Sequence, residues 1–136
     1  MLRFMLDTNI VIYVIKRRTL ELLEIFNRNA EHMSISSITL AELMHGVEKS
    51  SFPEKNLKVV EDFISHLEVL SYDESAAMHY GNIRSDLEKK GTIIGVNDLH
   101  IAAHARSRAL ILVTNNTREF ERVDGLRLVD WTEQDR

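Results

Sequence analysis

The stretch MLRFMLDTNIVIYVIK (residues 1–16) decides the fold, because it joins an apolar strand to an amphipathic helix through a polar turn. Leu2 to Leu6 is typical of a short buried strand. Asp7, Thr8 and Asn9 follow at once, and such short polar side chains accept the free N–H groups of a first helical turn. We expect this helix to run to about Lys16.

The same alternation of strand and helix continues along the chain. Amphipathic helices are expected around residues 20–26, from 37, from 53, from 73 to 91 and from 98 to 106. Further apolar strands are expected at 33–36, 69–70, 110–113 and 126–129. Short apolar strands that alternate with helices are typical of a parallel sheet covered on both faces. The pattern predicts an α/β fold, a three-layer α/β/α sandwich with a central, mainly parallel sheet of four to five short strands.

Length and composition limit the organisation and the chemistry. The 136 residues contain one proline, five glycines and no cysteine. No linker or repeat divides the chain, so residues 1–136 are expected to form a single domain. The lack of cysteine excludes thiolate metal sites and thiol nucleophiles. The N-terminal apolar run carries its basic residues after it, not before, and no stretch reaches the length of a membrane span. We therefore expect a cytoplasmic protein without a membrane partner.

The charge of the chain bears on nucleic-acid binding. The net charge of −4 counts against a basic nucleic-acid surface. Basic residues nevertheless cluster, and solvated helix ends are the favoured interpretation of the clusters. A shared groove lined by them is the alternative that the sequence leaves open. The clusters are Lys16 to Arg18, Lys89 with Lys90, Arg106 with Arg108, and Arg118 with Arg122.

Carboxylates stand where a parallel sheet binds its ligands. Such sheets bind ligands beyond the carboxyl ends of their strands. Asp7 directly follows the first strand, and Asn115 and Asn116 follow the strand LILV (residues 110–113), with Glu119 about one helical turn further on. Glu42 and Asp98 come from two further segments. Carboxylates that converge need a cation, and a site made only of oxygen ligands suits Mg²⁺ or Mn²⁺. Hydrolysis of a phosphodiester is the reaction that such a site supports.

Each of these acids also has a structural interpretation. Asp7 is a suitable N-cap, and Asp98, preceded by Asn97, is another. Thr39 and Glu42 have the spacing of a capping box, in which each side chain satisfies the other's end of the helix. For any one of these residues taken alone, capping is the favoured interpretation. Only their convergence in space would indicate a catalytic site.

Four segments together resemble the signature segments of the PIN-domain ribonucleases, and among these the VapC toxins of bacterial toxin–antitoxin pairs. They are MLDTNIVIYVIK, SSITLAELMHGVEKS, IGVNDLHIAAHARS and LILVTNNTREFERVDGLRLVDW. The resemblance runs from residue 1 to about residue 131. Val96 stands where the family has a proline. Amides at Asn115 and Asn116 occupy the neighbourhood of the family's usual fourth acid.

The resemblance implies specific roles for the polar residues. Asp7 and Asp98 would hold the main Mg²⁺ ion, for which Mn²⁺ can substitute. Glu42 would also hold the metal or orient the attacking water, and Glu119 is the candidate for the fourth catalytic acid. The supporting residues are Thr8 and Asn9, which order the first loop, Asn97 beside Asp98, Thr114 on a water, and Asn116 near the metal.

The resemblance also implies a reaction and partners. Metal-activated water would attack RNA in line and leave a 5′-phosphate and a 3′-hydroxyl. Transfer RNA is the expected substrate, with the anticodon loop of initiator tRNA as a specific candidate. The family forms homodimers, and a small antitoxin of the VapB type inhibits it by laying a helix in an apolar groove. Core packing is the favoured role of the residues that would otherwise line this groove, which are Leu20, Leu23, Leu43 and Met44.

The sequence also allows two other functions and one other metal site besides a magnesium-dependent nuclease. An aspartyl-phosphate phosphatase or a phosphorylation receiver needs a second acid near its strand-end aspartate, and Asn9 stands at that position. A binding module that has lost its chemistry is the other rival, against which the intact Asp7, Glu42 and Asp98 argue. His100 and His104 have the spacing of a zinc pair but lack the glutamate of H-E-x-x-H, so zinc is not assigned.

Overall fold

The expected three-layer α/β/α sandwich is present in the computed structural model of the chain, which describes residues 1–133. The last three residues of the expected domain, 134–136, lie outside the described residues. All strand pairs are parallel, and the strand order is β3-β2-β1-β4-β5. The strands are β1 (Phe4–Leu6), β2 (Met33–Ser36), β3 (Glu68–Leu70), β4 (Ile111–Val113) and β5 (Leu128–Val129).

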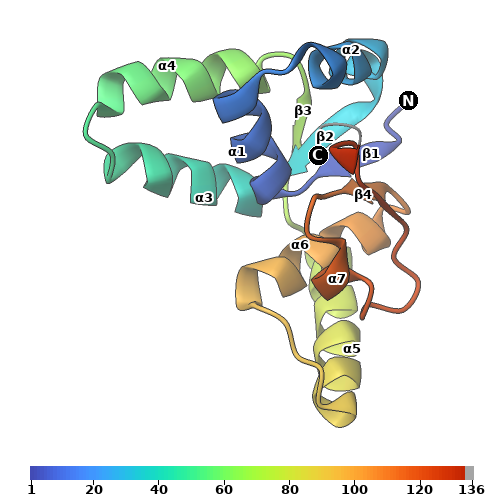
Figure 1. Cartoon of the computed structure of the whole chain (residues 1–136). Helices are drawn as coiled ribbons and strands as arrows, with labels where there is room; N and C mark the ends of the chain where they lie inside the picture. The colour runs from blue at the N-terminus through green and yellow to red at the C-terminus, as the bar shows by residue number, and fades with distance from the viewer. Residues whose placement is uncertain (134–136) are drawn as a thin grey trace.

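Helices cover both faces of this sheet (Figure 1). Helices α1, α2, α3 and α4 pack mainly on one face, and α5, α6 and α7 pack on the other. The helices α3 and α4 extend from the sheet as a hairpin, and α5 extends away from it on the other side (Figure 1). The bounds are α1 (Thr8–Arg17), α2 (Leu20–Arg28), α3 (Ser37–Glu48), α4 (Pro53–Ile64), α5 (Glu74–Lys90), α6 (Val96–Ser107) and α7 (Thr117–Phe120).

The order of the strands fixes where a site can form. β1 is the central strand, with Phe4 opposite Met33 of β2 and Leu6 opposite Val113 of β4. The chain leaves β1 toward β2 and β3 on one side and later returns to add β4 and β5 on the other. Connections that leave in opposite directions open a crevice at the carboxyl ends of the two strands where the order reverses. Here that crevice lies beyond β1 and β4.

Each face of the sheet has its own hydrophobic core. One core is formed mainly from α5 and α6, and the other from α1 to α4. The ring of Trp131 contacts the ring of Phe4 at 5.0 Å and that of Phe26 at 5.3 Å, both edge to face. Such aromatic contacts add to the burial of apolar area. Trp131 thus attaches the segment after β5 to the core under β1.

Two local expectations were wrong. α6 begins at Val96, with Gly95 as its N-cap, so Asp98 lies within the first turn and does not start the helix. The carboxylate of Asp98 is therefore not needed as a cap. Leu20 was expected in the core, but it is 70% exposed, because the first residue of α2 faces away from the sheet.

Within residues 1–133, the structure contains no helix with both the length and the apolar character needed to cross a bilayer.

Candidate active site

Asp7 lies at the crevice between β1 and β4 and is fully buried. The hydroxyl of Thr114, the residue that follows β4, donates a hydrogen bond of 2.9 Å to Asp7 Oδ2. The backbone N–H of Asn116 donates to Thr114 Oγ1 at 3.0 Å, which fixes the threonine in turn. Asp7 Oδ1 is buried and has no hydrogen-bond partner among residues 1–133. One oxygen of this carboxylate is therefore held in place while the other is unpaired.

The burial of Asp7 changes its titration. The pKa of Asp7 is raised from 3.8 to about 6, mainly by loss of hydration and to a smaller extent by the charge of Glu42. The Thr114 hydroxyl and the nearby backbone N–H groups of Thr8 and Asn9 oppose part of this increase. A carboxylate in this position is costly to ionise unless a cation accompanies it.

The pKa of Asp98 indicates that acids from four segments of the chain lie close together. Its pKa is raised to about 7, first by burial and then by the negative charge of Asp7. Glu119 contributes to this increase through a hydrogen bond that favours the protonated form of Asp98 and through its charge, and the charge of Glu42 contributes as well. The residues Asp7, Glu42, Asp98 and Glu119, which we call the acidic cluster, come from α1's N-terminal boundary, α3, α6 and α7. The structure therefore brings together the four acids singled out from the sequence.

Glu42 is oriented by two threonines. The Thr8 hydroxyl donates to Glu42 Oε1 at 2.7 Å and lies 3.0 Å from the hydroxyl of Thr39. Thr39 is fully buried, and Thr8 nearly so. This arrangement leaves the other carboxylate oxygen of Glu42 free of the threonines.

The capping interpretations do not account for these acids. Ser36, not Thr39, is the N-cap of α3, and it accepts a hydrogen bond from the N–H of Ile38. The capping box of Thr39 and Glu42 is therefore wrong, because both residues lie within the helix. Asp7 occupies the N-cap position of α1, but its side chain makes no capping hydrogen bond.

The supporting residues differ in how closely they contact the cluster. Thr8 and Thr114 bond directly to acids, whereas Asn116 acts through its backbone. Asn9 and Asn97 are exposed. Thr39 was missed as a site residue. Its spacing of three from Glu42 was the available signal, since it places both side chains on one face of a helix.

The donor set fits a hard divalent cation, although its side chains do not enclose one as they stand. Within residues 1–133, no three His, Cys, Asp or Glu side chains have the arrangement of a formed metal site. The unpaired, buried Oδ1 of Asp7 and the crowding of negative charge around Asp98 nevertheless call for a cation.

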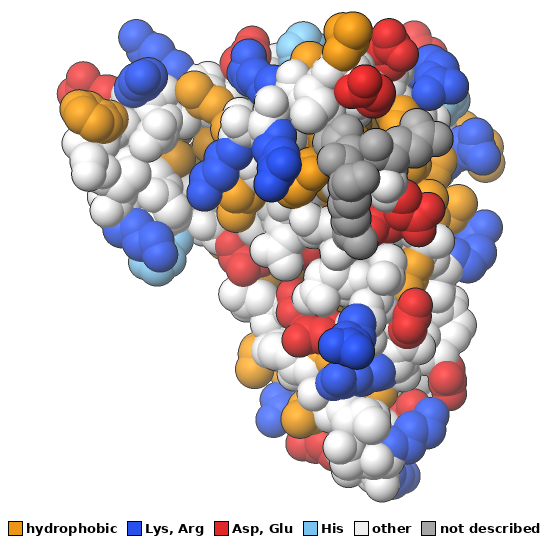
Figure 2. Space-filling view, viewed as in Figure 1, with side chains coloured by type: hydrophobic (Ala, Val, Ile, Leu, Met, Phe, Trp, Pro, Cys, Tyr) orange, Lys and Arg blue, Asp and Glu red, His pale blue; other side chains and the backbone are white. Residues whose placement is uncertain are grey.

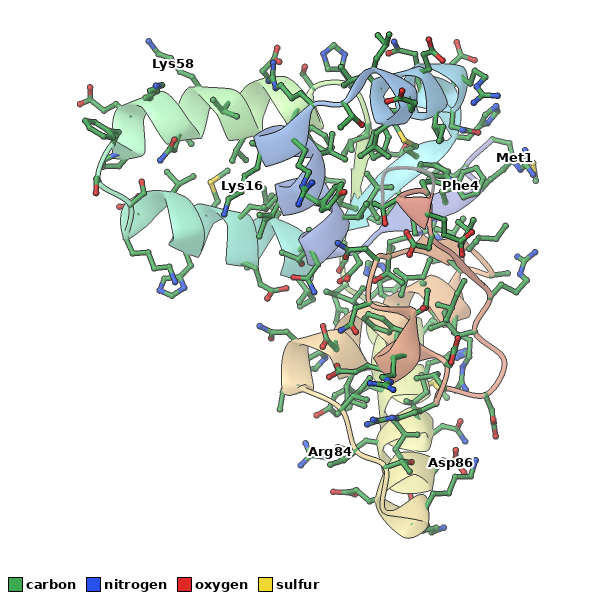
Figure 3. The ribbon with its side chains drawn as sticks, viewed as in Figure 1. Met1, Phe4, Lys16, Lys58, Arg84 and Asp86 are labelled. Carbon is green, nitrogen blue, oxygen red and sulfur yellow. The ribbon has the colours of Figure 1, made fainter. Side chains whose placement is uncertain are left out.

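Basic side chains flank the acidic region. Figure 2 shows acidic side chains in the middle of the molecule, with Lys and Arg side chains above them near the end of α1 and below them near α6 and α7. Lys16, labelled in Figure 3, lines a groove between α1, α3 and α4 together with Glu42. Other basic residues have structural partners. Arg106 bonds to His79, Asn82 and the carbonyl oxygen of Asp124. Lys16 and Arg106 do lie in the last turns of α1 and α6, as expected of helix ends, but Arg106 is held by side-chain hydrogen bonds and is not simply solvated.

Comparisons with known proteins agree with this fold. The family model for the PIN domain matches residues 4–126. The chain is 62% identical over 131 residues to Ribonuclease VapC2 of Haemophilus influenzae, a match that covers 96% of this chain and 99% of the relative. It is 57% identical over 132 residues to the tRNA(fMet)-specific endonuclease VapC of Shigella flexneri, covering 97% and 100%. The crystal structure of DNA-bound VapBC from Salmonella typhimurium contains a chain with a TM-score of 0.94 and 58% identity, covering 96% and 99%.

Proposed function

The chain belongs to the PIN-domain family and is a ribonuclease of the VapC type, and on that premise we propose that it is the toxin of a toxin–antitoxin pair that cuts RNA with the help of Mg²⁺. The observation that carries the proposal is the convergence of the acidic cluster, in which burial and then the neighbouring acids raise the pKa of Asp98 to about 7. Acids crowded in this way bind either a proton or a cation, and an all-oxygen set favours Mg²⁺ or Mn²⁺.

The proposed roles of the residues follow from their contacts. Asp7 and Asp98 would hold the cation, with the unpaired Oδ1 of Asp7 as one ligand atom. When bound, the cation neutralises the cluster and makes water a better nucleophile at neutral pH. Glu42 Oε1 is engaged by Thr8, which leaves Oε2 to orient the water that attacks the phosphodiester. Glu119 would add a fourth carboxylate to the site, beside Asp98.

A small antitoxin of the VapB type is the proposed regulator. A groove of about 260 Å³ between α1, α2 and α4 offers an apolar lining that includes Leu23, Phe26 and Phe63. Leu23 is 36% exposed, so it is available to a partner and is not a pure core residue. A helix laid in such a groove, with a basic side chain reaching the acidic cluster, would combine shape and charge recognition. A homodimer acting on RNA in the cytoplasm remains part of the proposal.

Transfer RNA is the proposed substrate, and an exposed loop is the expected cleavage site because unstacked bases are accessible there. The relative from Shigella flexneri carries tRNA(fMet) in its name, which makes the initiator tRNA the first candidate for this chain.

We expect the purified protein to cut initiator tRNA when Mg²⁺ or Mn²⁺ is present and to leave it intact with excess chelator. Sequencing of the RNA ends would identify the bond. An Asp98→Asn protein purified in parallel should not cut, which excludes a contaminating nuclease. Release of phosphate from small esters without any RNA cleavage would favour the phosphatase instead. If RNA of every class stayed intact under all metal conditions, the protein would be a binding module without nuclease activity.

The Thr8 hydroxyl gives a second prediction. Thr8→Val keeps the size of the side chain but removes the hydrogen bond to Glu42. Loss of a group that orients a metal-site residue typically lowers activity by about 10- to 100-fold, and we expect a fall of that size with unchanged secondary structure. Thr8→Ser keeps the hydroxyl and is the matched control. Cleavage rates equal to wild type in Thr8→Val would contradict the orienting role.

A further inference from the structure

A buried hydrogen bond joins the two helices that carry Glu42 and Asp98, at a distance from the acids themselves. His104 Nδ1 of α6 lies 2.7 Å from Ser36 Oγ, the N-cap of α3, although 68 residues separate them in the sequence. Both side chains are fully buried. Either neutral tautomer of the ring gives one hydrogen bond between the two groups.

Tyr72 reinforces this junction. Its hydroxyl lies 2.8 Å from His100 Nδ1, and its ring meets the ring of His104 edge to face at 5.5 Å. His100 is also stacked on Tyr80, at 4.2 Å between ring centroids. We call Ser36, Tyr72, His100 and His104 the α3–α6 clamp. None of its members belongs to the acidic cluster.

Stability alone does not explain a histidine at position 104. Its Nε2 is buried and has no hydrogen-bond partner among residues 1–133, so Ser36 is the one polar group that satisfies the ring there. A buried polar atom without a partner lowers stability, and an apolar side chain of similar size would avoid that cost. Burial lowers the pKa of His104 and so favours the neutral ring, and the opposing charge of Asp73 is the smaller influence.

Small rotations of α3 or α6 about the clamp would change the positions of Glu42 and Asp98. Glu42 is six residues beyond Ser36, and Asp98 is six residues before His104, so each acid lies roughly 9 Å along its helix from the clamp. A rotation of either helix by roughly 6° about the clamp would therefore move an acid by about 1 Å. An error of about 1 Å in the placement of reacting groups can lower a rate about 100-fold.

We propose that His104 is a positioning residue, which holds the start of α3 against α6 through Ser36 and so sets the separation of Glu42 from Asp98. This inference rests on the proposed function, since it concerns the same acidic cluster. It assigns to the buried ring a role in cation binding and RNA cleavage that is exerted wholly through the two helices.

Two substitutions with opposite effects on packing and bonding test the role. His104→Leu fills the space but removes the bond to Ser36, whereas His104→Asn leaves space but keeps an amide that can bond to Ser36. If the bond matters, His104→Leu should bind Mn²⁺ about 10- to 100-fold more weakly than wild type, with a matching fall in cleavage rate. His104→Asn should stay close to wild type in both. Binding of Mn²⁺ to the metal-free protein is measured by isothermal titration calorimetry.

Controls separate positioning from loss of stability. Leu22→Ala creates a cavity in the other core, on a helix that contributes nothing to the acidic cluster, and should lower the melting temperature without weakening Mn²⁺ binding. Ser36→Ala combined with His104→Leu should lose no more affinity than the stronger single variant, because both remove one bond. Wild-type Mn²⁺ affinity in His104→Leu, or equal loss in His104→Asn, would overturn the inference. If wild type binds Mn²⁺ but cuts no RNA, the proposed function fails, and the affinities still decide the role of His104.

Discussion

Asp7→Asn is expected to lower RNA cleavage by at least about 100-fold, the scale on which removal of one group that stabilises charge in a transition state acts. The change removes the negative charge of the most buried acid in the cluster. It also places an amide NH2 group, which cannot bind a cation, at the position of the unpaired Oδ1. The fold should remain, because an asparagine still accepts the hydrogen bond from Thr114 and still suits the N-cap position of α1. Cleavage assays at saturating Mg²⁺, with matched circular dichroism, measure both effects.

The same substitution should stabilise the metal-free protein. The folded-state pKa of Asp7 is about 6, above its ordinary value of 3.8. Its contribution to stability is therefore fully present below pH 3.8 and is lost as the pH rises through 6. Above pH 7 the ionised carboxylate costs about 3 kcal/mol, which Asp7→Asn would recover. The melting temperature at pH 8 in a chelator should then rise by roughly 5–10 °C.

Asp86→Asn is the matched control for Asp7→Asn. Asp86 is a partly exposed residue of α5 that lies far from the sheet in Figure 3, and it accepts a hydrogen bond from Lys90. The same chemical change there should alter neither cleavage nor melting temperature appreciably, because exposed ion pairs contribute little. Wild-type cleavage in Asp7→Asn would remove Asp7 from the site. An unchanged or lower melting temperature in the chelator would show that Asp7 is not strained by its burial.

Cation affinity should depend steeply on pH. Protons and a divalent cation compete for Asp98 and Asp7, whose pKa values are about 7 and about 6. Both groups are ionised at pH 8 and protonated at pH 5, so the affinity for Mn²⁺ should fall by about 10³-fold between these values. Calorimetry in buffers of different ionisation enthalpy should also detect protons released on binding near pH 6.

Asp98→Asn should weaken binding at pH 8 and flatten the upper part of this dependence, between pH 8 and about 6, because it removes the group that titrates there. An affinity that stays constant from pH 8 to pH 5 would mean that the acidic cluster does not hold the cation.

The fold could be predicted from the sequence because strand and helix periods are local. The turn Asp7-Thr8-Asn9, the apolar run at residues 110–113 and the helix start at residue 73 all have local signals, and Asp73 accepts a hydrogen bond from Ala76 N–H there. The start of α6 was placed wrongly because Asn97 and Asp98 are good capping residues by type. The backbone instead turns at Gly95, and no side chain caps the helix.

The acids of the site could be singled out from the sequence, but their environment could not. Thr39 had a local explanation as a capping residue, and only the approach of Thr8 from another helix shows its actual contact. The bond between Ser36 and His104 depends on how α6 packs against the end of β2, where α3 begins. Packing angles follow from the fit of many side chains, so no short pattern in the sequence encodes them.

The central position of β1 has a consequence for how the protein is made. β1 pairs with β4, so the Asp7 carboxylate meets Thr114 only after nearly the whole chain exists. During translation, a nascent chain whose β4 segment has not yet left the ribosome lacks the side of the crevice that β4 and Thr114 form. It also lacks Glu119. Fragments left by premature termination or by proteolysis before residue 110 should accordingly be harmless to the cell, and any toxicity should arise only on release of the finished polypeptide.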